Sequence, residues 1–256
     1  MELARCQAIV TGAAGGLGGS FARELLAAGA RVAAGDANAA GLRELAAAAA
    51  GLPGQLHVSR LDVADEASVA AFVDFAAERM DGLNLLINSA GIARDGLLVT
   101  PAGGEVQTLP LAQWRKVIDV NLTGQFLMTR AFAARLVAAG TRDAVVVNLS
   151  SIARAGNPGQ SNYAASKAGL DACTRTWALE LARHGIRVGG VAPGVTATGF
   201  LAGFSEEALA RLAAAIPLGR LGQPRDVWQA VRFIVECEFF TGRTVEVDGG
   251  AGMGVL

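Results

Sequence analysis

The chain carries little charge, and what it lacks excludes several classes of protein. Its 22 Lys and Arg and 23 Asp and Glu give a net charge of −1, and no basic block is present that would bind nucleic acid or an anionic membrane. No apolar run approaches the ~20 residues that span a bilayer, and the first residues lack the charged-then-apolar pattern of a targeting segment. We therefore expect a cytoplasmic protein with neither nucleic acid nor membrane as a partner.

Cysteine is scarce as well. The three cysteines, Cys6, Cys173 and Cys237, have neither metal-ligand nor redox spacing. We expect reduced thiols with structural roles, and no metal ion bound by the protein.

Apolar residues are abundant, at 52% of the chain against 18% charged residues, so a large buried sheet covered by helices is possible. Short apolar segments alternate with longer helical patterns, which is typical of a parallel sheet with helices on both faces and right-handed crossovers. No linker, repeat or composition shift divides the chain. We predict an α/β fold: a single-domain doubly wound Rossmann fold over residues 1–256, with a seven-stranded parallel sheet. The strands are predicted at 6–10, 31–36, 56–61, 84–88, 144–149, 186–191 and 243–247, and the helices at 16–28, 38–50, 66–80, 111–138, 162–183, 206–215 and 224–236.

A glycine-rich turn joins the first predicted strand to the first predicted helix. It reads Thr-Gly-Ala-Ala-Gly-Gly-Leu-Gly from Thr11 to Gly18. Such a turn lets the backbone approach a pyrophosphate, and the following helix offers free N–H groups and the positive end of its dipole. The spacing is T-G-x-x-x-G-x-G rather than G-x-G-x-x-G, because Phe21 stands where the last glycine would be. The alternative is a plain flexible loop in a chain with 33 glycines.

An acidic residue ends the second predicted strand. Asp36 lies about 20 residues past the glycines, where an acid can accept hydrogen bonds from the hydroxyls of an adenosine ribose. Its charge would repel a 2′-phosphate, and neither the glycine turn nor Ala37 and Asn38 supplies an Arg or Lys to bind one. The sequence therefore favours NAD over NADP as the cofactor.

A tyrosine and a lysine stand four residues apart in a predicted helix. Tyr163 and Lys167 share one face of that helix, because residues i and i+4 lie side by side. A phenol titrates near pH ~10 when unperturbed, and a nearby cation favours the phenolate and lowers its pKa. The pair could thus exchange a proton at neutral pH, although most such pairs merely lie on the surface of a helix.

These features resemble motifs of the short-chain dehydrogenase/reductase family, and the family's other motifs follow in order over nearly the whole chain. The further motifs are Asp62-Val63, Asn88-Ser89-Ala90-Gly91, Asn121-Leu122-Thr123-Gly124, Asn148-Leu149-Ser150-Ser151, Pro193-Gly194 with Thr198, Thr241-Gly242, and Val247-Asp248-Gly249-Gly250. The second of these departs from the family's N-N-A-G, because Ser89 stands in place of its second Asn.

The resemblance implies an NAD-dependent oxidoreductase acting on CH–OH groups. Tyr163 would exchange the proton, and Lys167 would lower the pKa of the phenol and bond the nicotinamide ribose. Asn121 would sit in a bend of the fourth helix and fix a water that links Lys167 to solvent, and a serine would hydrogen-bond the substrate oxygen. The implied cofactor-binding residues are Gly12, Gly15, Gly16, Leu17, Gly18, Asp36, Asp62, Val63, Asn88, Ala90, Gly91, Tyr163, Lys167, Pro193, Gly194, Val195 and Thr198.

Two adjacent serines compete for the catalytic role. The family's usual spacing to the tyrosine selects Ser150, whereas the strand pattern N-x-S-S selects Ser151, with the loop at 153–158 shortened by one residue. Strand side chains alternate between faces, so only one of the two can point into the site. We choose Ser151, because a loop accommodates a deletion more easily than a buried strand accommodates a register slip. Ser150 remains the alternative.

The substrate is less well defined by the sequence. The Ala- and Leu-rich segment at 198–216 is expected to form a substrate lid. The loop from Asp95 to Trp114 is longer than in typical family members, and either walls the substrate cleft or extends a surface hairpin. Resemblance to 3-oxoacyl reductases and short-chain 3-hydroxyacyl-CoA dehydrogenases implies a 3-oxoacyl or 3-hydroxyacyl thioester, on acyl carrier protein or CoA. It also implies a homotetramer. A secondary-alcohol, polyol or steroid dehydrogenase is the close alternative, and a non-catalytic nucleotide sensor is the remote one.

Overall fold

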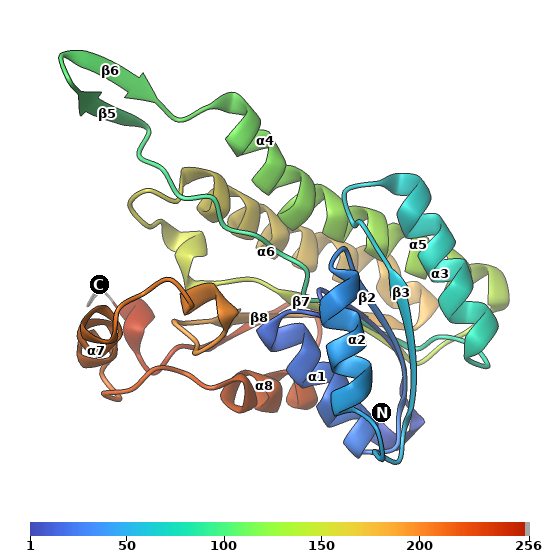
Figure 1. The fold of residues 1–256 in the computed structure, drawn as a ribbon. Coiled ribbons are helices and arrows are strands. Elements are labelled where there is room, and N and C mark those ends of the chain that lie inside the picture. Colours follow the sequence, from blue (N-terminus) through green and yellow to red (C-terminus); the bar gives the residue numbers. More distant parts are fainter. Residues whose placement is uncertain (254–256) are drawn as a thin grey trace.

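Seven parallel strands form the central sheet of the computed structural model, which describes residues 1–253 (Figure 1). They lie in the order β3-β2-β1-β4-β7-β8-β9, so the chain changes direction across the sheet between β1 and β4. Ligands of doubly wound folds bind at the carboxyl ends of the strands beside such a point. The predicted fold class is confirmed. The strands are β1 (Gln7–Thr11), β2 (Arg31–Asp36), β3 (Gln55–Arg60), β4 (Leu85–Asn88), β7 (Ala144–Leu149), β8 (Ile186–Pro193) and β9 (Thr244–Val247).

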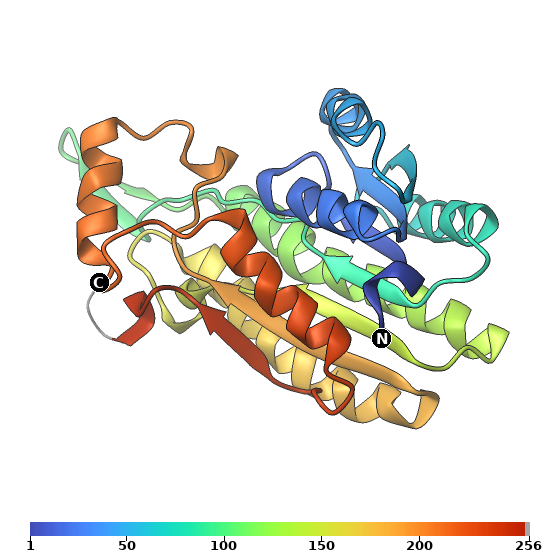
Figure 2. The same ribbon diagram turned by 90° about the horizontal axis from the view of Figure 1, so that it is seen from below.

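Helices cover both faces of this sheet, because its strands are apolar on both sides. In β1, Ala8 and Val10 belong to one buried cluster and Ile9 to the other. The first cluster is completed by α1 (Gly16–Ala27), α2 (Ala39–Ala48) and α8 (Pro224–Glu236), and the second by α3 (Glu66–Arg79), α5 (Gly124–Ala139) and α6 (Ser161–Leu181). Figure 2 shows α1 and α8 lying over the same face.

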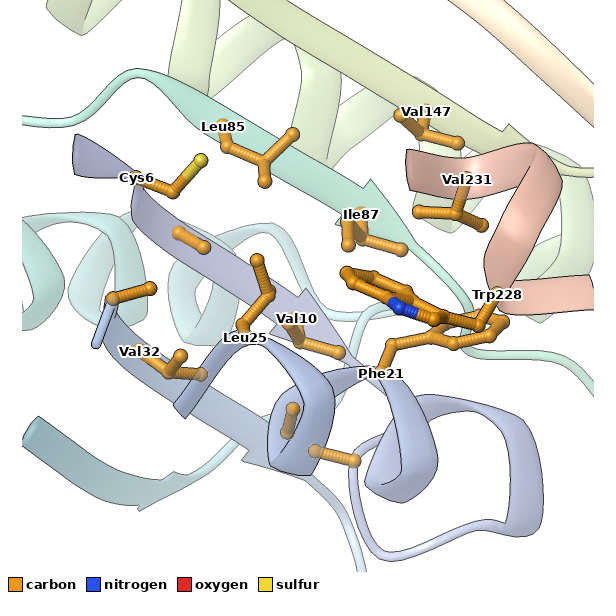
Figure 3. Packing of buried hydrophobic residues seen from close by; sticks show 14 of the residues in the cluster. Cys6, Val10, Phe21, Leu25, Val32, Leu85, Ile87, Val147, Trp228 and Val231 are labelled. Atoms are coloured by element: carbon orange, nitrogen blue, oxygen red, sulfur yellow. The ribbon is translucent and has the colours of Figure 1, made fainter. Parts of the chain in front are cut away.

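Aromatic packing joins α1 to α8 in the first cluster. The rings of Phe21 and Trp228 have centroids 6.0 Å apart, and both lie beside Ile87 and Val231 (Figure 3). Phe21 is fully buried, and burial of such a side chain contributes roughly 1.5–3 kcal/mol. This contact explains why phenylalanine stands at position 21, where the dinucleotide fingerprint would have glycine.

The long loop before α4 (Leu111–Ile118) forms a hairpin of β5 (Val99–Ala102) and β6 (Glu105–Thr108) that projects from the molecule (Figure 1). Gly103 and Gly104 make the two-residue turn, both at positive φ (59° and 90°), which suits the twist of a tight hairpin. Of the two alternatives for this segment, the structure has the surface hairpin.

The helix predicted at 111–138 is interrupted. Between α4 and α5 lies a π-helical turn, Asp119–Thr123, that contains Asn121 at its centre. Such a turn places an extra residue in the helix and is frequent at functional sites. Helix α7 (Glu206–Ala215) follows a 3₁₀ turn at Gly199–Leu201 in the segment expected to form the lid. None of the helices within residues 1–253 is both long enough and apolar enough to span a bilayer.

Candidate active site

A cavity of about 350 Å³ opens where β1, β2, β3 and β4 end. The loops that follow these strands supply most of its walls, with Lys116 and Val120 from the α4 region and Phe200 from the expected lid. The predicted cofactor residues that line it are Gly12, Gly15, Gly16, Leu17, Gly18, Asp36, Asp62, Val63, Ala90, Gly91 and Thr198.

The glycine turn fits closely against its surroundings, so side chains are excluded from it. Gly12 has a φ of 67°, and a Cβ atom there would lie 2.7 Å from the Cα of Ala90. A Cβ on Gly18 would lie 2.3 Å from the carbonyl oxygen of Gly12. Helix α1 starts after Gly15, which offers no side chain to cap it. Its first N–H groups and the positive end of its dipole are therefore suited to bind a pyrophosphate.

Two side chains hold the turn in place. Asp36 accepts hydrogen bonds from the backbone N–H groups of Ala14 (3.0 Å) and Asn38 (2.8 Å), so β2 is tied to the turn. Thr11 accepts from the N–H groups of Ser89 and Ala90, at 3.0 Å each, which joins the end of β1 to the end of β4. Each carboxylate oxygen of Asp36 can accept a further hydrogen bond.

Several predicted cofactor residues do not line this cavity. Asn88 is fully buried, and its amide donates to the Thr129 hydroxyl and to Asn148, at 2.9 Å each. Pro193 ends β8, the N–H of Gly194 donates to Val247, and the carbonyl of Val195 accepts from Gly222. Asn88 therefore belongs to a ladder of buried, hydrogen-bonded polar side chains at the carboxyl ends of β4 and β7. Residues 193–195 lie beside the carboxyl-terminal segment.

Tyr163, Lys167 and Ser151 come together beyond the cavity, at the end of β7. The Ser151 hydroxyl lies close enough to the Tyr163 hydroxyl to lower the pKa of that phenol, and the ammonium of Lys167 lies 5.6 Å from the centroid of the Tyr163 ring. Lys167 is 4% exposed and donates to the carbonyl of Leu149 at 2.6 Å. A Cβ on Gly91 would lie 3.7 Å from that ammonium nitrogen, so this group adjoins the cavity wall.

Ser150 faces away from these groups. It is 5% exposed, and its hydroxyl donates to the backbone carbonyl of Lys167 at 3.4 Å, on the inner side of α6. Ser151 is half-buried, and its hydroxyl accepts a hydrogen bond from the N–H of Ala153. This bond caps the start of the 3₁₀ turn Ile152–Ala155. Of the two serines, only Ser151 is directed towards Tyr163.

Asn121 connects the interrupted helix to this group. Its side chain accepts from the N–H of Ile92 (2.8 Å) and donates to the carbonyl of the same residue (2.9 Å) and to the hydroxyl of Ser166 (3.3 Å). The π-helical turn directs this amide inward, towards the loop after β4 and towards α6. The four residues predicted as catalytic therefore surround the end of β7.

The sequence and the fold match known proteins over almost the full chain. Residues 12–252 match the family model described as Enoyl-(Acyl carrier protein) reductase. A 3-oxoacyl-[acyl-carrier-protein] reductase of Thermotoga maritima is 38% identical over 245 residues, covering 94% of this chain and 96% of the relative. The cis-4-hydroxycyclohexanecarboxylate dehydrogenase of Sinomonas cyclohexanicum is 39% identical over 246 residues, 95% of each. A crystal structure of a short-chain type dehydrogenase/reductase from Mycobacterium marinum gives a TM-score of 0.89 at 28% identity, covering 98% of both chains. The chain belongs to the short-chain dehydrogenase/reductase family.

Members of this family use a nicotinamide cofactor, and the residues of the cavity fit one. The side-chain-free glycine turn, the uncapped start of α1 and the carboxylate of Asp36 offer the three kinds of contact that a dinucleotide needs. When bound, the nicotinamide ring supplies or accepts the hydride.

The electrostatics of this short-chain dehydrogenase/reductase differ from the sequence expectation in one respect. Burial raises the pKa of Tyr163, the hydrogen bond with Ser151 lowers it, and the charge of Asp95 raises it, with an overall upward shift. The expectation that Lys167 lowers the pKa of the phenol is not met in this structure. Burial lowers the pKa of Lys167 to about 8, against a smaller upward effect of Asp171, and its ammonium bonds the Leu149 carbonyl instead of the phenol.

Sequence reasoning missed several residues that shape the site. Asn148 donates to Thr174 at 2.9 Å and so extends the ladder of Asn88 into α6. Cavity-lining residues that carried no motif are Ala37, Leu61, Ile92, Arg94, Lys116 and Val120, whereas Ser89 belongs to the motif at Asn88–Gly91 and Phe200 to the expected lid. Their partners lie far away along the chain, so no local pattern could have identified them.

The buried charge of Lys167 predicts a pH dependence of stability. Its pKa is about 8 in the fold against an ordinary value of 10.5, so between these values the unfolded chain binds more protons and the free energy of unfolding rises with pH. The protonated, buried Lys167 lowers the free energy of unfolding by its full amount below pH 8, and this loss is gone by pH 10.5. We expect the stability difference between Lys167→Met and the native chain to change by about 3 kcal/mol across this window.

Urea unfolding at several pH values from 7 to 10.5 measures this difference. Cys6 works in the opposite direction, because burial raises its pKa to about 12 and the fold then loses stability as pH rises above the thiol's ordinary pKa. That contribution is common to both proteins and cancels in the comparison. Parallel stability curves for the two proteins would show that Lys167 keeps its ordinary pKa.

Proposed function

We propose that this short-chain dehydrogenase/reductase interconverts a secondary alcohol and a ketone with NAD(H), and that its substrate is a 3-oxoacyl or 3-hydroxyacyl thioester of acyl carrier protein or CoA. The observation that carries the proposal is that the Ser151 and Tyr163 hydroxyls lie together at the end of β7, with the ammonium of Lys167 5.6 Å from the centroid of the Tyr163 ring. A phenol, a second hydroxyl and a cation at one point are the groups that carbonyl reduction requires.

In the proposed reaction each side chain has a separate task. Tyr163 donates its proton to the ketone oxygen in reduction and accepts it back in oxidation. Ser151 hydrogen-bonds the same oxygen and fixes its position as negative charge develops. Lys167 returns a proton to the phenol and bonds the cofactor's ribose. Asn121 holds the loop after β4 against α6 and, as a further proposal, orders a water beside Lys167.

Neutral pH suits the reductive direction. The phenol of Tyr163 is protonated there, as a tyrosine of ordinary pKa near ~10 would also be, and its pKa is raised further by burial. A protonated phenol is the acid that reduction of a ketone needs. Oxidation needs the phenolate and is therefore expected to gain as the pH rises. We propose that the enzyme works as a reductase near pH 7.

Asp36 supports NAD as the cofactor. Its carboxylate lines the cavity at the end of β2, beside Ala37, where a 2′-phosphate would meet a negative charge. The cationic residues that line the cavity, Arg94 and Lys116, belong to the loop after β4 and to α4 rather than to this turn.

The thioester proposal is supported by similarity to the Thermotoga maritima reductase and by the apolar character of the expected lid. Phe200 lines the cavity and is exposed, as is Phe204, so both are free to contact an acyl chain. A second candidate function is the oxidation of the secondary alcohol of a cyclic hydroxy acid. It is favoured by similarity to the Sinomonas cyclohexanicum dehydrogenase, whose identity to this chain is equally high.

We also propose that the protein is a single domain and forms a homotetramer in the cytoplasm, as family resemblance implies. The outer faces of α5 and α6 carry exposed apolar side chains, including Phe126, Val137 and Leu179. These fit an interface between copies of the chain.

A substrate panel tests the proposed function. Ketones, secondary alcohols, cis-4-hydroxycyclohexanecarboxylate and 3-oxoacyl thioesters are assayed with NADH or NAD⁺ and with NADPH or NADP⁺, by absorbance of the reduced nicotinamide. We expect the 3-oxoacyl thioester to have the highest kcat/KM, and NADH to bind at least tenfold tighter than NADPH, which is about 1.4 kcal/mol. Asp36→Asn is the matched control, since the amide keeps an acceptor oxygen but removes the charge, and it should reduce this preference.

Two results contradict parts of the proposal separately. Equal affinities for NADH and NADPH in a fluorescence titration overturn the role of Asp36. A higher kcat/KM for the cyclic hydroxy acid than for any thioester selects the second candidate.

A further inference from the structure

Arg154 makes three polar contacts immediately beside the proposed catalytic group. Its Nε lies 2.6 Å from Oδ2 of Asp171, and its Nη2 lies 2.6 Å from Oε1 of Glu246. Its Nη1 donates to the backbone carbonyl of Ser151 at 3.2 Å. The guanidinium thus uses all three of its nitrogen atoms on groups from different elements.

The main ion pair of this cluster is largely shielded from water. The side chains of Arg154 and Asp171 are 19% and 11% exposed, whereas Glu246 is 54% exposed. The second oxygen of Asp171 accepts from the Thr244 hydroxyl at 3.2 Å. Breaking a pair of this kind leaves an uncompensated charge in a poorly hydrated place, which favours one fixed geometry.

The cluster joins three elements at the site. Arg154 lies in the 3₁₀ turn Ile152–Ala155, which begins at Ser151. Asp171 lies on α6 one turn after Lys167. Thr244 and Glu246 lie on β9, the last strand at that edge of the sheet. The position of Ser151 relative to Tyr163 therefore depends on how this turn is fastened to α6.

We infer that Arg154, Asp171 and Glu246 form an ionic clasp that positions the Ser151 hydroxyl against Tyr163. Its service to catalysis rests on the proposed function. The clasp residues are positioning residues, because they contact the backbone of Ser151 and not the reacting atoms. Without Asp171, Arg154 keeps only Glu246 and the Ser151 carbonyl, and the half-exposed Glu246 draws it towards solvent.

Asp171 has a second link to the site. Its negative charge raises the pKa of Lys167 against the effect of burial, while among the described residues β7 gives that ammonium the Leu149 carbonyl and the loop after β4 places Gly91 beside it. Loss of its charge also removes the support that Asp171 gives to the protonated form of Lys167.

The pKa of Tyr163, measured without cofactor or substrate, reports whether the clasp holds Ser151 in position. Tyr163 is the single tyrosine of the chain, so its phenolate absorbance is seen alone. The groups that face it are Ser151, Lys167 from its own helix and Asp95 from the loop after β4. Because the Ser151 hydrogen bond lowers the pKa of Tyr163, its loss should move the titration to higher pH.

The experiment compares Ser151→Ala, Asp171→Asn, Arg154→Met and the double clasp variant with the native chain, and circular dichroism at each pH confirms the fold. We expect the clasp variants to shift the phenol titration in the same direction as Ser151→Ala, and the double variant to add little to either single one. In the thioester assay kcat should fall about tenfold to a hundredfold with little change in KM, as for a displaced catalytic group. Arg154→Lys keeps the charge but cannot bridge three groups, so it should also be impaired.

The matched control is Arg232→Met, which breaks an exposed Arg–Glu pair on α8 and should change neither readout. The inference is overturned if Ser151→Ala shifts the phenol titration and the clasp variants do not, or if Ser151→Ala leaves it unmoved. It is also overturned if the clasp variants shift the titration but keep full kcat. A native chain that reduces none of the substrates overturns the proposed function instead, and the titration still decides whether the clasp holds Ser151.

Discussion

Replacing Tyr163 with phenylalanine is expected to lower kcat by about 10²–10⁴-fold, the usual contribution of a positioned acid or base. The substitution removes one hydroxyl and keeps the ring that packs against Lys167. No other phenol can take over, because the chain contains a single tyrosine. Affinity for NADH should remain within a factor of about two. Steady-state rates with the best substrate of the panel and a fluorescence titration of NADH measure the two quantities.

The same variant separates an enzyme from a nucleotide sensor. A sensor has no use for the phenol, so a chain whose slow turnover is equal with and without the Tyr163 hydroxyl is not a catalyst of the proposed kind. Thr176→Val provides the matched control. It also removes one hydroxyl from α6, at an exposed position where the group only bonds the carbonyl of Ala172, and should leave turnover unchanged.

Ser151→Ala should lower kcat by about 10²–10³-fold, whereas Ser150→Ala should lower it by less than about threefold. Ser151 is the serine whose hydroxyl lies near the Tyr163 phenol, where it could hold the substrate oxygen. The Ser150 hydroxyl bonds a helix carbonyl at 3.4 Å on the buried side of the strand end. Its removal should therefore affect stability slightly and chemistry little.

Kinetics and thermal unfolding of the two variants measured side by side check this pair of predictions. The reverse order of effects would mean that the spacing to the tyrosine, and not the strand pattern, selects the catalytic serine. Loss of activity in both variants with a matching fall in Tm would point to damage to the strand end rather than to a catalytic hydroxyl.

The parts of the fold that could be predicted are each specified by residues close together in the sequence. The apolar runs of β1, β2 and β7 are buried on both faces, so they read as continuous hydrophobic segments, and the glycine turn stands directly between one strand and one helix. The hairpin at residues 99–108 was not predicted as strands, because β6 is exposed along its whole length and the hairpin's valines Val99 and Val106 face solvent, so no apolar face marks a buried strand. The interruption of the helix at Asn121 was expected from the family motif alone.

Side-chain direction at the site was predictable only in part. Alternation along a strand predicted that only one of the two serines enters the site, and the structure directs the two hydroxyls to different sides. The choice of Ser151 over Ser150 came from the N-x-S-S pattern and from the ease with which a loop accommodates a deletion. The pKa of Tyr163 could not be predicted, because it depends on burial and on which acceptor the neighbouring ammonium finds. Lys167 bonds the carbonyl at the end of β7, a group contributed by a different element of the fold.

Local sequence was enough to predict the succession of strands and helices along the chain, the glycine turn, the acid at Asp36 and the pairing of Tyr163 with Lys167, since each depends on residues near one another in the chain. The ladder from Asn88 through Asn148 to α6, the direction of the phenol's pKa shift, and the clasp of Arg154 with α6 and β9 arise only in the folded molecule. These depend on contacts between segments tens of residues apart, and burial and hydrogen-bond partners exist only once the sheet has brought such segments together.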